Sequence, residues 1–320
     1  MKMVLLAALA VAPALHAQTQ WKLATGYRAE SFQTRNLVQF AQEVERTSAG
    51  ALRIEVHANN TLVKLADIAQ AVQGGNPQAG ETIMTNLAGE IPIAGADALP
   101  FVVRSYADAR RLWDLQRPLI DKHFAAKGLK ALYAVPWPPQ GLFSIAPVRS
   151  PSDFKGTRMR TYNAGTVRIA EMLGATPVDV PMVEVSKALS SGKLDSMITS
   201  ALTGVENQVW GQIRQYYGIN AWFPKNIVLV NRQAFDALPA SVRQAVAQAA
   251  TMAETRGWAM SAAVAEESVA ELQRKGIKVD RAPPELEAEL KRMGERFSLE
   301  WVHSVGREAN QIFIPYYTQR

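Results

Sequence analysis

The chain has 320 residues, a formal net charge of +6 and no cysteine, which excludes disulfides, thiol catalysis and cysteine-bound metals. Its four histidines, at positions 16, 57, 123 and 303, match no metal-binding spacing. Acidic and basic residues are mixed along nearly every segment, whereas a nucleic-acid-binding protein would gather its cations on one element. We therefore expect no metal, no cofactor and no nucleic-acid partner.

Residues 1–17 are predicted to be a signal peptide. A lysine near the N-terminus precedes an apolar run at residues 4–11, and a small residue, Ala17, closes the segment. The run is much shorter than the roughly 20 apolar residues of a membrane-spanning helix. Leu15 fits poorly at the third position before a cut after Ala17, so the mature chain is expected to begin near Gln18.

The first part of the mature chain is predicted to alternate strands and helices. Residues 21–27, 51–59 and 81–88 have the alternating or continuous apolar patterns of strands. Ser31 is a candidate N-cap for a helix after the first strand, and residues 65–75 predict a helix ended by glycines. This order favours a parallel sheet covered by helices.

The same alternation continues through the middle of the chain. Residues 105–128 predict one or two helices, and residues 129–145 predict a strand interrupted by three prolines. A further strand is expected at 157–162 and a helix at 164–175. Residues 182–200 repeat the order of helix, glycine and strand. A second α/β unit therefore follows the first.

A helix of roughly 35 residues is predicted from Pro239 to Lys275, after a strand and turn at 225–239. A second charged helix is predicted at about 284–306. Two α/β units joined by crossing segments and one long helix indicate a two-lobed clamshell with a ligand cleft between the lobes. The expected domains are 18–143 plus about 226–265, and 144–225 plus about 266–320.

The stretch DFKGTRMRTYNAGT, residues 153–166, contains the strongest candidate for ligand binding. Arg158, Arg160 and Tyr162 share one face of the predicted strand. Both arginines could be solvated or paired with surface acids. Alternatively, one is a carboxylate clamp, because a guanidinium stays charged and can donate two parallel hydrogen bonds to a carboxylate. Asn163 could add a donor, and the small residues after it leave room for backbone N–H groups to face an anion.

Two aromatic clusters lie where the chain is expected to cross between the lobes. Trp137 stands among three prolines within residues 136–144, and Trp222 and Phe223 stand within residues 220–226. Each cluster could be a packed corner, or it could line the cleft. If both clusters face the cleft, the ligand has a flat or apolar part.

Residues 153–200 resemble the periplasmic solute-binding subunits of TRAP transporters, the tripartite ATP-independent uptake systems of dicarboxylate type. Their pattern is roughly D-L-K-G-x-K-x-R, then x-x-L-G-A-x-P, then E-V-x-x-A-L-x-x-G-x-x-D-G. The residues on this pattern are Asp153, Lys155, Gly156, Arg160, Leu173, Gly174, Ala175, Pro177, Glu184, Val185, Ala188, Leu189, Gly192 and Asp195. The likeness continues in residues 230–246 and, more faintly, in 40–62.

The resemblance implies a periplasmic, non-enzymatic receptor whose two α/β domains, spanned by one long helix, close on a ligand. It gives Arg160 the role of carboxylate ligand and places Arg158 on a variable surface position. Asn163 and Met182 match positions that often contact the ligand. The other candidate contacts are Tyr27, Asn86, Trp137, Gln140, Phe143, Tyr162, Thr199, Ser200 and Trp222. The expected partners are a carboxylate and the small and large membrane subunits of the transporter, and the receptor itself is expected to be a monomer.

Departures from the family pattern bear on the ligand. Many relatives have a second arginine in a Gly-x-Arg stretch, where this chain reads PPQGLFS and offers Gln140 or Phe143. The family's Asp-Gly-x-Glu-Asn run is DSMITS here, so Ser196, Ile198 and Thr199 replace more polar residues. One clamp arginine and added aromatic residues argue against a C4-dicarboxylate or sialic acid. We expect a monocarboxylate with an aromatic or apolar body, such as mandelate or benzoylformate.

Two other functions stay open at this point. An exported enzyme acting on a small organic acid is one, although the sequence shows no G-x-S-x-G motif, no P-loop and no recognisable nucleophile–base set. A binding protein that serves an ABC importer or a sensor kinase is the other.

Overall fold

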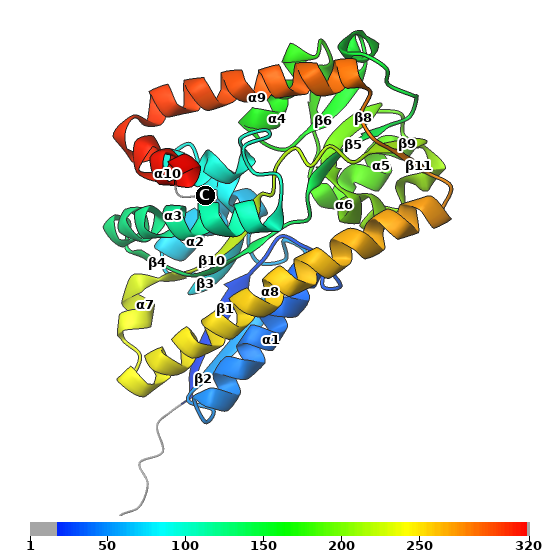
Figure 1. Cartoon of the computed structure of the whole chain (residues 1–320). Helices are drawn as coiled ribbons and strands as arrows, with labels where there is room; N and C mark the ends of the chain where they lie inside the picture. Colours follow the sequence, from blue (N-terminus) through cyan, green and yellow to red (C-terminus); the bar gives the residue numbers. More distant parts are fainter. Residues whose placement is uncertain (1–17, 319–320) are drawn as a thin grey trace, which may run out of the picture.

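The computed structural model describes residues 18–318, which form two lobes, each built on a mixed sheet (Figure 1). The predicted signal peptide, residues 1–17, lies outside the described residues. The first lobe contains a five-stranded sheet in the order β2 (Leu52–His57), β1 (Thr19–Ala24), β3 (Ala79–Ile83), β10 (Lys225–Asn231) and β4 (Leu129–Pro136). The second contains a six-stranded sheet in the order β11 (Lys278–Asp280), β9 (Gln215–Tyr217), β5 (Gln140–Ser144), β8 (Ser196–Ser200), β6 (Arg158–Thr161) and β7 (Thr176–Asp179).

The sheets combine parallel pairs with strands that return across the molecule. In the first lobe β1 is parallel to β2 and β3, as the sequence predicts, while β10 is antiparallel to β3 and β4. In the second lobe β6 is parallel to β7 and β8, and β5 is antiparallel to β8 and β9. The expected return of the strand near residues 226–231 to the first lobe is therefore confirmed.

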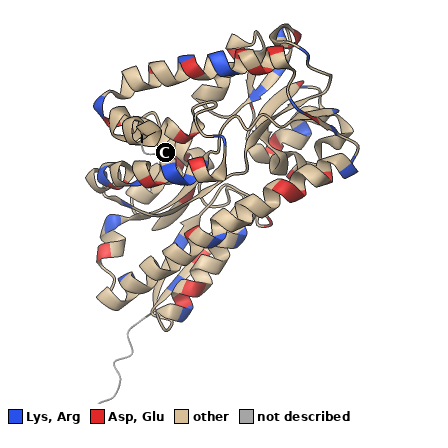
Figure 2. Ribbon diagram, in the orientation of Figure 1, with Lys and Arg blue, Asp and Glu red and all other residues tan. Residues whose placement is uncertain are grey.

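Ten α-helices cover the two sheets within residues 18–318. They are α1 (Phe32–Thr47), α2 (Ile68–Gln73), α3 (Tyr106–Ala126), α4 (Ala164–Met172), α5 (Val185–Ser190), α6 (Ala201–Glu206), α7 (Arg232–Asp236), α8 (Ala240–Arg274), α9 (Pro284–Val305) and α10 (Arg307–Thr318). Lys, Arg, Asp and Glu are interspersed on most of them (Figure 2). No helix in this part of the chain is long and apolar enough to cross a membrane.

The long helix α8 joins the lobes by running along one side of both, and α9 returns along the opposite side (Figure 1). In the first lobe α8 packs on α1 and β4, and in the second on α6 and β11. Small residues recur on its buried face, including Ala249, Ala253 and Gly257. A Cβ atom at Gly257 would lie 2.4 Å from Val135 Cγ2 of β4, so this close helix–sheet contact requires glycine.

The two segments that cross between the lobes are hydrogen-bonded to each other. Trp137 N donates to Pro224 O at 2.8 Å, Gln140 N to Trp222 O at 3.0 Å, and Ala221 N to Gln140 O at 2.9 Å. This pairing makes a two-stranded connection at the hinge, and the side chains next to it are held in fixed positions.

Three local predictions differ from the structure. The predicted strand 81–88 ends at Ile83, and Met84–Leu87 form a 3-10 turn that buries Met84 and Leu87. Ser31 is the N-cap residue of α1, but its side chain makes no capping hydrogen bond. The helix α10 was not predicted, and its buried side chains Ile312, Phe313 and Tyr316 join the first-lobe core. The domain bounds stay a prediction.

Candidate ligand-binding site

Arg160 is a buried cation near the end of β6. Its side chain is 4% exposed, and its only hydrogen bond within residues 18–318 runs from Nε to Val180 O at 2.9 Å. The Cζ atom lies 5.0 Å from the ring centroid of Tyr162. Burial lowers the pKa of Arg160 to about 10, so the guanidinium remains charged at neutral pH. Its two terminal nitrogens are free to donate to a ligand.

Arg158, two residues earlier, is a surface residue. Its Nη2 and Nε donate to the two Asp195 oxygens at 2.7 and 2.8 Å, and Nη1 donates to Gly192 O. Nearly half of its side chain is exposed. The bidentate pair lowers the pKa of Asp195, and each of the three Arg158 side-chain nitrogens already has an acceptor. The two arginines therefore differ as the resemblance implied.

Aromatic and amide groups surround Arg160 in the second lobe. Tyr162 Oη accepts a hydrogen bond from Trp222 Nε1 at 3.3 Å and makes a long one, 3.5 Å, to Gln140 Oε1. Gln140 in turn donates from Nε2 to Pro138 O at 2.8 Å. Burial raises the pKa of Tyr162 to about 12, so its hydroxyl stays neutral. Three of the predicted residues thus form one connected wall with Arg160.

A second set of polar aromatic residues belongs to the first lobe. Trp137 Nε1 and Tyr27 Oη both donate to Asn226 Oδ1, at 2.8 and 3.1 Å, and the two rings lie 4.9 Å apart between centroids. Glu81, on the strand β3 that pairs with the strand of Asn226, accepts a hydrogen bond from Thr25 Oγ1 at 2.6 Å. Burial raises the pKa of Glu81 to about 7.

The second-lobe wall is in contact with the first-lobe set of Tyr27, Trp137 and Asn226, which we call the first-lobe wall. Tyr162 and Met182, both from the second lobe, pack on the first-lobe core cluster that contains Tyr27 and Trp137. Arg28, just after β1, also contacts the second lobe: Nη2 donates to Val183 O and to Asn207 Oδ1, both at 3.2 Å, and Nη1 donates to Glu206 O. The two lobes are therefore in direct contact in this structure.

Asn163 has a structural role that still leaves one polar group free. Its Oδ1 caps α4 by accepting a hydrogen bond from Thr166 N at 2.9 Å. The amide Nδ2 is not needed for this cap and remains a possible donor. Ala164 and Gly165, which follow it, are exposed at the helix start.

Other predicted residues make no side-chain hydrogen bond to this group. Phe143 is fully buried with its ring 4.7 Å from that of Tyr216, and strand alternation turns it to the opposite face of β5 from Gln140. Gln140, not Phe143, is therefore the residue that meets Tyr162. Ser200 caps α6, Thr199 is buried opposite Gly141, and Asn86 Nδ2 makes a long bond to Thr82 Oγ1.

Sequence reasoning missed Glu81, Asn226 and Arg28. Glu81 is an acidic residue within a fully buried strand, which was a usable signal of an unusual environment. Asn226 and Arg28 carried no local signal, because their partners are distant in sequence.

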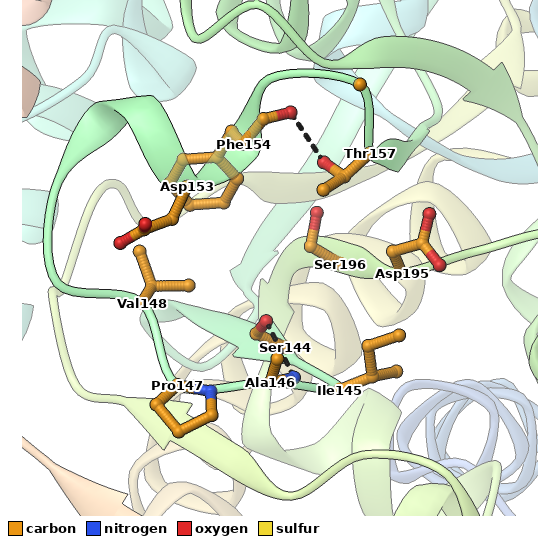
Figure 3. Close-up of a pocket in the computed structure, with 11 residues that line it drawn as sticks. Ser144, Ile145, Ala146, Pro147, Val148, Asp153, Phe154, Thr157, Asp195 and Ser196 are labelled. Atoms are coloured by element: carbon orange, nitrogen blue, oxygen red, sulfur yellow. Dashed lines mark hydrogen bonds between the residues drawn. The ribbon is translucent and has the colours of Figure 1, made fainter.

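A separate hollow of about 260 Å³ lies at the far end of the second-lobe sheet (Figure 3). Ser144, Val148, Thr157 and Ser196 are among its lining residues. Ser144 and Ser196 stand at the ends of β5 and β8 opposite to Gln140 and Ser200, so this hollow is not part of the site described above. Within residues 18–318, no group of three or more His, Asp or Glu side chains is placed to hold a metal ion.

Two α/β lobes, a hydrogen-bonded hinge and a buried arginine between the lobes define a two-lobed binding protein. The family model for bacterial extracellular solute-binding protein, family 7 (DctP), matches residues 23–301, and the chain belongs to this family. It is a periplasmic TRAP solute receptor for organic acids and not an enzyme. The predicted family and the two-lobed fold are thereby confirmed, and the exported-enzyme alternative is wrong.

Similar proteins fall in the same class. The Bordetella pertussis extracytoplasmic solute receptor DctP7, which binds pyroglutamic acid, is 38% identical with a TM-score of 0.91, over 93% of this chain and 99% of that one. A marine metagenome TRAP solute-binding protein specific for pyroglutamate is 35% identical with a TM-score of 0.91, over 94% and 99% of the two chains. The C4-dicarboxylate-binding periplasmic protein DctP of Rhodobacter capsulatus is 28% identical over 69% of this chain and 67% of its own length.

Proposed function

We propose that the protein captures a small cyclic monocarboxylate, with pyroglutamate as the first candidate, and delivers it to the small and large membrane subunits of a TRAP transporter. The observation that carries the proposal is Arg160, a buried and charged guanidinium whose terminal nitrogens make no hydrogen bond within residues 18–318. A carboxylate that leaves water needs such a partner, because an unpaired buried charge is strongly unfavourable. One buried clamp arginine suits one carboxylate.

The ring of the ligand would lie among Tyr27, Trp137, Tyr162 and Trp222, whose indole and phenol groups are held by hydrogen bonds. The sequence predicts a monocarboxylate with an aromatic or apolar body, such as mandelate or benzoylformate. Relatives 35% and 38% identical bind pyroglutamate, which also has one carboxylate and a compact ring but has a polar lactam in place of an aromatic body. Pyroglutamate therefore comes first, and the aryl acids are its competitors.

Binding would work by shifting the lobes toward the closed arrangement. The carboxylate would pair with Arg160 in the second lobe while the ring contacts Tyr27 and Trp137 in the first, so that one ligand makes contacts in both lobes only when they close. Gln140, Asn163 and Met182 would complete the second-lobe wall. Thr199, Ser200 and Asn86 would border the site, and we propose a monomer with the domain bounds given above.

The test is a thermal-shift and calorimetric panel of L-pyroglutamate, mandelate, benzoylformate and succinate on the purified receptor. Free ligand at 100 times Kd stabilises a protein by about 2.7 kcal/mol, which gives an easily measured rise in Tm. We expect pyroglutamate to give the largest rise and succinate to give none. A larger rise with an aryl acid would reassign the ligand within the same class, and tight succinate binding would contradict a single-carboxylate site.

A further inference from the structure

The direction of the hydrogen bonds on the first-lobe wall is fixed by chemistry. An indole Nε1–H can only donate, so the Asn226 atom that lies 2.8 Å from Trp137 Nε1 must be its oxygen. Tyr27 Oη lies 3.1 Å from that same oxygen. Since an oxygen of an amide has no proton to give, Tyr27 must donate its only proton to Asn226.

The Asn226 amide cannot reverse this direction. A flipped amide would place its NH₂ group against the indole N–H, so that two donors would face each other. In the observed orientation the buried NH₂ group has no hydrogen-bond partner within residues 18–318, and the orientation is set by the indole alone. The side chain of Asn226 is 1% exposed in the middle of the sheet, where water cannot compensate a wrong orientation.

Tyr27 is consequently an acceptor and not a donor for anything in the cleft. Its phenol is buried, which raises its pKa well above the usual range and keeps the proton in place. The hydroxyl oxygen retains lone pairs, and the ring of Tyr27 belongs to the first-lobe cluster on which Tyr162 packs, with Arg160 Cζ 5.0 Å from the centroid of the Tyr162 ring. Tyr162, in contrast, already accepts from Trp222 and donates to Gln140.

The two walls thus present opposite hydrogen-bonding groups to one ligand: donors at Arg160 and an acceptor at Tyr27. We propose that Tyr27 determines specificity by accepting a hydrogen bond from an N–H group beside the ligand's carboxylate. The receptor would then select a cyclic amide acid over an acid of the same shape that lacks this N–H. This inference rests on the proposed function and names the ligand group that the first lobe recognises.

The experiment compares two ligands of nearly equal shape by isothermal titration calorimetry: L-pyroglutamate and 5-oxotetrahydrofuran-2-carboxylate, in which a ring oxygen replaces the N–H. An oxygen facing the Tyr27 lone pairs loses a hydrogen bond and places two acceptors together. We expect the wild type to bind the lactone at least about 10-fold more weakly, the usual size of losing a buried hydrogen bond. Equal affinities for the two ligands would overturn the inference while leaving the proposed function intact.

The variant Tyr27→Phe keeps the ring and removes the acceptor. Its lactam-to-lactone affinity ratio is expected to fall to within about threefold of unity, whereas the surface variant Arg158→Ala should keep the wild-type ratio. A Tyr27→Phe protein that folds, as judged by its circular dichroism melting curve, and retains the full wild-type ratio would overturn the assignment to Tyr27. Failure of the wild type to bind either ligand would instead refute pyroglutamate-like acids as the ligand class.

Discussion

Replacing Glu81 by glutamine is expected to remove a large part of the pH dependence of stability. Burial raises the pKa of Glu81 from 4.5 to about 7 in the folded protein. Because the pKa of Glu81 is higher in the folded than in the unfolded protein, its full contribution to stability is present at pH values below the unfolded-state pKa. This contribution is lost as pH rises through about 7. The difference between the two pKa values corresponds to about 3 kcal/mol, which is a large fraction of the stability of a typical protein.

The assay is urea denaturation of the ligand-free wild type and Glu81→Gln at several pH values between 5 and 8. Glutamine does not titrate, so the wild type should lose about 2.5 kcal/mol relative to the variant over this range, the rest of the difference lying below pH 5. Burial also raises the pKa of Glu206 to about 7, but both proteins contain Glu206 and its effect cancels in the comparison. A wild-type-minus-variant difference that stays constant from pH 5 to 8 would refute the assigned environment of Glu81.

Three further substitutions probe separate parts of the structure. Gly257→Ala should lower stability by about 1–3 kcal/mol and reduce Tm, because the new Cβ would lie 2.4 Å from Val135 Cγ2; an unchanged Tm would contradict this close packing. Arg158→Ala should lower the free energy of unfolding by less than about 1 kcal/mol and leave ligand affinity, measured by titration calorimetry, unchanged. Lost binding would give Arg158 a role in the site. Arg28→Ala removes the hydrogen bonds from the first lobe to second-lobe oxygens and should weaken ligand affinity about 10-fold. Small-angle X-ray scattering should show a more open bound state. Unchanged affinity would mean that these bonds do not favour closure.

The main elements of the fold could be predicted because their signals are local. The helix α8 follows directly after Pro239 and continues through a proline-free stretch, so its position was determined by the sequence alone. The end of β3 was missed because an apolar run fits a buried strand and a buried turn equally well. The helix α10 was missed because its apolar face has meaning only against α3.

The site residues named from the sequence stay predictions, and Arg160 shows what the pattern alone could and could not indicate. Arg158 and Arg160 have the same side-chain chemistry and share one face of a strand, so alternation alone could not tell which is buried. The family resemblance distinguished them; in the structure Arg158 is paired with Asp195 at the surface and Arg160 is buried, while the ligand role of Arg160 stays a prediction. Asn226 and Glu81 could not be placed from sequence, since their hydrogen-bond partners come from other strands and from the hinge.

The role of Arg160 can be measured by calorimetric titration of Arg160→Ala with the organic acid that raises the wild-type Tm most. We expect affinity to fall by at least about 100-fold, because the carboxylate would enter a buried site without its counter-charge. Arg160→Lys should bind with intermediate affinity, since it restores the charge without the paired donors. Binding of the acid by a folded Arg160→Ala protein with wild-type affinity would contradict the central claim.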